Sequence, residues 1–315
     1  MKKISIRINI NKNMCQLNIF PDFCIKDAER LYVIGNGFDI HHNIESKYWD
    51  FKNWVLKNRK DSGLVGLMDT FFSNDREFWG EIEKALGEYN EEEVTDFCEP
   101  DNPEDFKYDH PGQWQDGLEG SIPWVFGQTM DEFRDAFGAW VKSIDLDGVK
   151  ADLIMPVDSR YLTFNYTETL EKVYGIPKDN VLHIHGSRLI PGDEFVIGHC
   201  NDRDKDAPLR NDEILLPYQN AYSEVIRIMN EWKKDSEYLI RKNEAFFHSL
   251  RTTRAVCVMG LSYSEVDMPY LQKVADSVAA DCKWWLYYYN DDDRIRANKM
   301  AVMLGLNDYC LRQFE

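Results

Sequence analysis

The stretch Leu31–Asp39, LYVIGNGFD, constrains the fold of this chain more than any other. It begins with four apolar residues between a charged segment and a glycine, which is typical of a buried parallel strand. Gly35 and Gly37 follow, and the pattern then becomes helical. A strand that turns through glycines into a helix presents backbone N–H groups to an anion such as phosphate. Ile40 stands where the Rossmann fingerprint has a third small residue, so an ordinary turn and a ligand loop both remain open.

The composition is that of a globular protein, with 315 residues of which 43% are hydrophobic. A formal net charge of −18 argues against binding to nucleic acid or to an anionic membrane. No apolar run approaches the roughly 18 residues that span a bilayer, and the N-terminal MKKISIRINI lacks a signal-peptide core. The seven Cys contain no CxxC pair, so neither a disulfide framework nor a zinc site is indicated. We therefore expect a cytoplasmic protein with no membrane contact and no tight nucleic-acid binding.

Strands alternate with helices along most of the chain, which predicts an α/β fold with a mostly parallel sheet and helices on both faces. One or two short strands are expected within 1–30, ahead of the main fold. Further strands are expected at 31–34, 161–164, 181–185, 195–197, 255–259 and 284–289. Helices are expected at 167–174, within 212–250, and at 267–278 and 292–304. We treat 1–315 as a single Rossmann-like domain.

Residues 45–150 interrupt this alternation and predict a helical insertion. Ser46 is expected to cap its first helix, and apolar residues at helical spacing predict further helices at 75–90 and 129–144. Between the last two, 91–120 holds eleven acidic residues, one Lys and three Pro. Such a composition favours a loop or a partly disordered segment that holds no core.

Polar residues follow four of the expected strands. Ligands of open parallel sheets bind beyond the carboxyl ends of the strands, so these sets are expected to meet at one site. They are Gly35-Asn36-Gly37-Phe38-Asp39, Asn165-Tyr166-Thr167, His185-Gly186-Ser187 and Gly260-Leu261-Ser262.

His185 and Asn165 are the candidates for chemistry within these sets. A histidine at a strand end suits a general base, although it is also common as a structural residue. Asn165 offers a donor and an acceptor for a ribose hydroxyl or an attacking water, or it caps the next helix in competition with Thr167. His183 and His185 lie two apart and would share one face of a strand, as a metal pair does. No third ligand is evident, although Asp39, His41 and His42 could approach, and we expect no metal.

Cys200 adjoins His199 in IGHCND. Its thiol is either an ordinary loop thiol or a catalytic nucleophile, and the first interpretation is favoured. Hydrolysis by a serine triad and binding by a P-loop are not indicated, because neither motif occurs.

Several segments together resemble the AbiH family of bacterial abortive-infection proteins. They are VIGNGFD, FNYTETLE, LHIHGS and MGLSYSEVDMPYL, in this order over about 30–305. The resemblance implies a role in defence against phage, with a phage-encoded trigger that the sequence does not identify. It leaves the oligomeric state open, including a homo-oligomer.

A more distant likeness connects the chain to sirtuins and sirtuin-like NAD hydrolases. The glycines at 35 and 37, Asn165, and the pair His185-Gly186 are similar to motifs of that family in order and spacing. In that family the Asn and His lie at the ribose, so the resemblance implies Asn165 as an orienting residue and His185 as base or ribose clamp. Tyr166-Thr167-Glu168 follows Asn165 where the family motif has an Asp, and there is no four-cysteine zinc ribbon, which argues against a protein deacylase.

The resulting hypothesis is a sirtuin-like fold that binds NAD or a related nucleotide and cleaves its N-glycosidic bond. Asp39 and Asp267 are expected to bind hydroxyl groups. A nucleotide-binding sensor without catalysis is the alternative, and a protein-interaction switch that uses 91–120 is another. The expected ligand-binding residues are Gly35, Asn36, Gly37, Phe38, Asp39, Tyr166, Gly186, Gly260, Ser262 and Asp267, beside the catalytic candidates His185 and Asn165.

Overall fold

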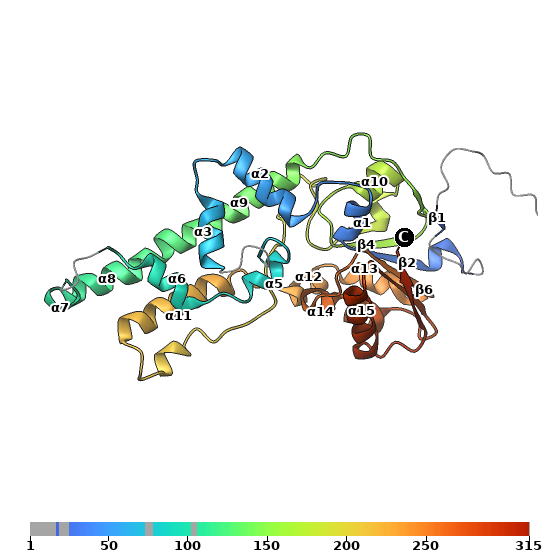
Figure 1. The fold of residues 1–315 in the computed structure, drawn as a ribbon. Helices are drawn as coiled ribbons and strands as arrows, with labels where there is room; N and C mark the ends of the chain where they lie inside the picture. The colour runs from blue at the N-terminus through green and yellow to red at the C-terminus, as the bar shows by residue number, and fades with distance from the viewer. Residues whose placement is uncertain (1–16, 19–24, 73–77, 102–105, 315) are drawn as a thin grey trace, which may run out of the picture.

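The structure is a computed structural model that describes residues 17–18, 25–72, 78–101 and 106–314. A parallel sheet flanked by helices lies at the right of Figure 1, and a group of helices extends from it to the left. Helix α5 (Ile82–Leu86) lies near the junction of the two parts.

Six parallel strands form the main sheet in the described part of the chain, which confirms the expected Rossmann-like α/β class. Their order is β5-β4-β2-β6-β7-β8. In chain order this is 3-2-1-4-5-6, the arrangement of dinucleotide-binding folds, with the topological switch point between β2 and β6. The strands are β2 (Arg30–Ile34), β4 (Arg160–Thr163), β5 (Val181–His183), β6 (Ala255–Met259), β7 (Lys283–Tyr288) and β8 (Tyr309–Gln313).

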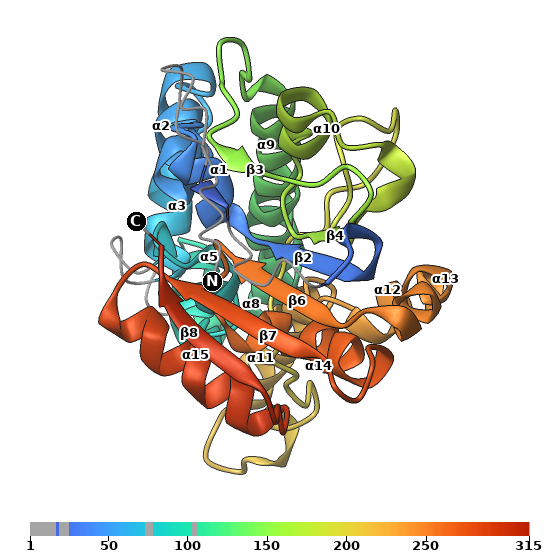
Figure 2. The same cartoon turned by 90° about the vertical axis from the view of Figure 1, so that its right-hand side faces the viewer.

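Side chains alternate between the two faces of the sheet along each strand. Both faces are apolar here, and helices cover each of them. Tyr32 and Ile34 pack with α1 (Asn36–His41) and α10 (Thr169–Tyr174). Leu31 and Val33 pack with helices of the opposite face, and Figure 2 shows those helices on the other side of the sheet from α1 and α10. That second group comprises α12 (Ser236–Lys242), α13 (Glu244–Ser249), α14 (Met268–Ser277) and α15 (Asp291–Met303).

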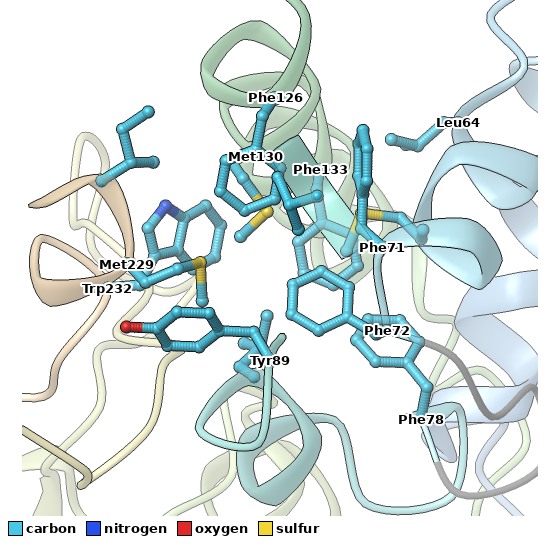
Figure 3. Packing of buried hydrophobic residues seen from close by; sticks show 14 of the residues in the cluster. Leu64, Phe71, Phe72, Phe78, Tyr89, Phe126, Met130, Phe133, Met229 and Trp232 are labelled. Carbon is cyan, nitrogen blue, oxygen red and sulfur yellow. The ribbon is translucent and has the colours of Figure 1, made fainter. Parts of the chain in front are cut away.

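The remaining helices form a second hydrophobic core, which we call the helical body. Its centre is aromatic: Phe71, Phe126 and Phe133 are almost fully buried there (Figure 3). Helix α11 comes from outside 45–150 and packs against α6 and α8. The helical body comprises α2 (Tyr48–Asn58), α3 (Leu64–Phe71), α5, α6 (Glu91–Cys98), α7 (Phe106–Asp109), α8 (Pro111–Ser121), a π-helical segment Ile122–Gly127, α9 (Gln128–Ser143) and α11 (Leu216–Asn230).

The expectation that 91–120 is a loop without a core is wrong for the residues described there. Val94 and Leu118 are fully buried in the helical body, and Trp114 is nearly so. The side chain of Asn90 caps α6 by accepting from the backbone N–H of Glu92. Glu92, Glu93 and Asp96 of α6 and Asp116 of α8 are exposed, whereas α11 packs against both helices and covers their few apolar side chains.

Several expected element ends also differ. The helix expected at 75–90 is a turn followed by the shorter α5, with 73–77 outside the described residues. Lys47 rather than Ser46 is the N-cap of α2. Residues 195–197 form no strand; instead the N–H of Val196 donates to the carbonyl of His185.

Near the N-terminus, one expected short strand is present as β1 (Leu17–Asn18), which pairs in parallel with β3 (Leu153–Ile154). The other expectation, at ISIRINI, lies outside the described residues. The edge strand β8 was not predicted, because its short YCLRQ pattern is only half buried against β7.

Candidate functional site

A cavity of about 900 Å³ lies at the carboxyl end of the sheet, lined by loops after β2, β4, β5 and β6 and by the helical body. This is the position where parallel open sheets bind ligands. Ten of the predicted site residues line it, whereas Phe38 and Gly186 do not. The ten are Gly35, Asn36, Gly37, Asp39, Asn165, Tyr166, His185, Gly260, Ser262 and Asp267.

The glycines at the switch point hold two loops together. The N–H of Gly35 donates to the carbonyl of Met259 at 2.9 Å, and the N–H of Gly37 donates to that of Gly260 at 2.8 Å. A Cβ on Gly35 would lie 2.5 Å from the carbonyl oxygen of Gly260. These two N–H groups are therefore engaged within the protein, and the missing side chains provide room for a backbone-to-backbone contact. The two groups are not directed at a phosphate.

Asp39 is buried to 1% exposure at the start of α1. Its Oδ2 accepts a hydrogen bond of 2.5 Å from the Thr167 hydroxyl, whereas its Oδ1 is buried and has no partner among the described residues. Burial raises the pKa of Asp39, and hydrogen bonds from the side chains of Thr167, Thr169 and Asn165 partly offset this. Thr167 thus binds Asp39 instead of capping α10, whose N-cap is Glu168.

Asn165 and His185 each leave one buried polar atom without a partner in the described structure, Oδ1 and Nε2 respectively. The His185 ring packs edge-on against Phe164 and Tyr270. Burial, and to a lesser extent the positive charge of Lys234, lowers the pKa of His185 well below its usual value, so its imidazole is neutral at pH 7. A neutral imidazole is able to accept a proton or a hydrogen bond.

Asp267 lies at the start of α14, where its side chain is nearly buried and lines the same cavity. Burial, with the neighbouring Glu83 carboxylate as the second cause, raises the pKa of Asp267 to about 7. Ser264 donates a long hydrogen bond of 3.4 Å to its Oδ2. Asp267 therefore exchanges a proton near neutral pH, which suits a hydrogen-bonding partner for a ligand hydroxyl.

The other histidine and cysteine candidates are engaged elsewhere. The two ring nitrogens of His183 lie 2.9 Å from the carbonyl of Asn165 and 2.9 Å from the Glu171 carboxylate, and β5 ends at His183, so His183 and His185 are not a strand pair. His199 hydrogen-bonds to the carbonyl of Met229, and the Cys200 thiol is directed to Oδ1 of Asn201 at 3.8 Å. Partial burial raises the pKa of Cys200, which disfavours the nucleophilic thiolate.

Among the described residues, no group of three or more His, Cys, Asp or Glu side chains is arranged to hold a metal ion. No helix within these residues is both long enough and apolar enough to cross a bilayer.

Sequence reasoning missed the wall of the cavity that the helical body supplies. Glu83 on α5 lines the cavity, as do several aromatic side chains of α2 and α9 and the turn before α5. Arg296 and Lys299 of α15, a helix that packs on the sheet, also line it. No local sequence pattern predicts that these residues line a cavity. A glutamate on a short helix or a lysine on an amphipathic helix is ordinarily a surface residue. The missed aromatic residues are Tyr48, Trp49, Trp79, Phe137 and Trp140.

The chain matches the family model described as Bacteriophage abortive infection AbiH over residues 31–289. The matched range includes the strand ends that line the cavity and the whole helical body. No curated protein matches the chain significantly, and no solved structure does.

Proposed function

Because the chain belongs to the AbiH family of bacteriophage abortive infection proteins, we propose that it acts in the cytoplasm by binding NAD or a related nucleotide in the cavity and hydrolysing its N-glycosidic bond. The phage-defence role follows from the family, whereas the ligand and the reaction are argued from the site.

One observation carries this proposal: three buried polar atoms without hydrogen-bond partners belong to residues that line one cavity. They are Oδ1 of Asp39, Oδ1 of Asn165 and Nε2 of His185, each from a segment that follows a different strand. A buried polar atom without a hydrogen bond costs about 1–3 kcal/mol. Three such atoms at the carboxyl edge of a sheet are explained if a ligand with several hydroxyl groups satisfies them, as a ribose does.

The charges of the cavity suggest how such a ligand lies. Arg296 and Lys299 of α15 line the cavity. The Nε of Arg296 donates to the carbonyl of Ser262 at 2.9 Å, and its Nη2 donates to Oδ1 of Asp293 at 2.5 Å. We place the phosphates beside these two residues, since the N–H groups of Gly35 and Gly37 are already engaged. The ribose then lies over Asp39 and Asn165.

In the reaction, a water oxygen attacks C1′ of the ribose while the bond from C1′ to the base nitrogen breaks. The base leaves with the electron pair of that bond, and the proton of the attacking water passes to Nε2 of the neutral His185. Asn165 orients the water or the 2′-hydroxyl. General-base assistance of this kind contributes about two to four orders of magnitude in rate.

The test uses the purified full chain, incubated with NAD in the presence and absence of lysate from phage-infected cells. Nicotinamide and ADP-ribose are quantified by chromatography. We expect His185→Ala to lose at least about a hundredfold of the wild-type rate, and His248→Ala, an exposed histidine of α13, to retain it. Absence of NAD consumption by wild type under both conditions, or full activity in a folded His185→Ala protein, contradicts the proposed hydrolysis.

A nucleotide sensor without catalysis is the second candidate, and the shape of the site favours it specifically. The cavity is lined from both the sheet and the helical body, so a bound ligand contacts both and biases their relative arrangement. Calorimetric binding of NAD with no product over hours distinguishes the sensor from the hydrolase.

A further inference from the structure

The helical body and the turns beside it contribute several charged residues, among them Glu83 and Lys84 of α5, and several aromatic rings to the cavity, and none of them belongs to the strand-end sets. Glu83 lies on α5, Tyr48 on α2, and Phe137 and Trp140 on α9, with Trp79 in the turn before α5. The rings of Trp79, Phe137 and Trp140 are buried almost completely, although all three line the cavity. The wall is therefore a fixed part of the packed core.

Glu83 is held in place by two neighbours. Its Oε1 lies 2.6 Å from Nζ of Lys234, whose side chain is only 2% exposed. The hydroxyl of Tyr48 also hydrogen-bonds to Glu83. The backbone N–H of Lys234 donates to the carbonyl of His199 at 2.9 Å, which fixes the lysine. A buried ion pair costs desolvation energy and is weak evidence for stability, so a role at the cavity is a better explanation for it.

The aromatic rings make the same wall suitable for a positive charge. The face of a Trp or Tyr ring carries negative potential and attracts cations at about 6 Å or less from its centroid. Nζ of Lys52 lies 5.3 Å from the centroids of both Trp49 and Trp79, although Lys52 itself does not line the cavity. The wall already stabilises one cation from outside the cavity, and Glu83 adds a carboxylate on the inside.

We propose that Glu83 and the two less buried rings of this wall, Tyr48 and Trp49, form a subsite for a cationic heteroaromatic ring, such as the pyridinium ring of oxidised nicotinamide. This inference rests on the proposed function, because it assigns the base of the nucleotide to a place in the same cavity. The phosphates lie at α15, the ribose at the strand ends, and the base against the helical body. Glu83 provides the countercharge, and the aromatic rings provide stacking.

The subsite has a direct consequence for selectivity. Oxidised NAD carries a positive nicotinamide ring, whereas the dihydronicotinamide ring of NADH is neutral, and the two share every other group. The subsite therefore favours the oxidised form. Loss of the glycosidic bond converts the cationic ring into neutral nicotinamide, so the product is bound more weakly than the substrate and is released.

The test compares two small probes of the ring alone, the 1-methylnicotinamide cation and neutral nicotinamide, by quenching of tryptophan fluorescence. We expect the cation to bind wild type about tenfold more tightly than the neutral ring, and Glu83→Gln to remove most of that preference. Glu237→Gln, an exposed glutamate of α12, serves as the matched control and keeps the preference. Equal affinities of wild type for the two rings overturn the subsite, and this comparison needs no variant.

Retention of the full preference in a folded Glu83→Gln protein also overturns the assignment of Glu83. The same probes separate this inference from the proposed function. A preference for the cation without NAD hydrolysis supports the subsite and contradicts the proposed hydrolysis. NAD hydrolysis without a preference for the cation supports the proposed hydrolysis and contradicts the subsite.

Discussion

Replacement of Gly260 by alanine tests whether the contact between the two switch-point loops stabilises the fold. Gly260 has φ +67°, and a Cβ there would lie 2.2 Å from the backbone nitrogen of Phe38 and 2.7 Å from the carbonyl carbon of Gly37. Gly63 also has φ +67°, but a Cβ there has no atom within 4 Å among the described residues. The two glycines therefore share the same backbone strain and differ in the steric clash.

The left-handed conformation costs a non-glycine residue about 1–2 kcal/mol, which applies to Gly63→Ala and Gly260→Ala alike. Gly260→Ala must in addition push the loop after β2 away from the loop after β6, because both contacting atoms belong to the backbone and cannot rotate aside. Overpacking of this kind costs about 1–3 kcal/mol more. We therefore expect Gly63→Ala to lose about 1–2 kcal/mol of unfolding free energy and Gly260→Ala about 2–5 kcal/mol.

The assay is equilibrium denaturation of both variants and wild type in guanidinium chloride, followed by circular dichroism and tryptophan fluorescence. The difference between the variants isolates the contact between the loops. Equal destabilisation by the two changes would show that the loops are not packed as the structure has them. In that case Gly35 and Gly37 would not serve to bring the two backbones together either.

Three further predictions follow from charge and capping. Burial holds the pKa of Asp267 at about 7 in the folded chain against 3.8 ordinarily, so the folded state keeps a proton that the unfolded state loses and stability falls as pH rises from about 4 to about 7. In denaturation titrations, Asp267→Asn should therefore become progressively more stable than wild type as pH rises from about 4 to about 7. A gain in stability that does not depend on pH refutes the raised pKa of Asp267. Asn90→Ala should cost about 1 kcal/mol through the lost cap of α6, and amide exchange at Val94 should be slow; fast exchange there would restore the view of 91–120 as a loop. The net charge of −18 predicts no tight binding to duplex DNA, and a dissociation constant below about 1 µM at physiological salt would contradict it.

The sequence by itself determined the parts of the fold that rest on continuous local patterns. Ala255–Met259 is a strand with the expected bounds, and the strand expected at 31–34 begins one residue earlier, at Arg30. Both are buried on both faces of a parallel sheet, so each reads as an apolar run ended by a glycine. The order of such runs also predicted that Asn165 and His185 would come to one edge of the sheet, because parallel strands end on the same side.

Only the tertiary structure decided which distant residues complete the core and the cavity. Segment 91–120 holds helices because α11, about a hundred residues later, covers its few apolar side chains. Glu83 belongs to the cavity because the helical body places α5 against the strand ends, where Lys234 pairs with it. Local patterns record how a residue relates to its neighbours along the chain, whereas burial and charge pairing depend on which distant segment arrives beside it.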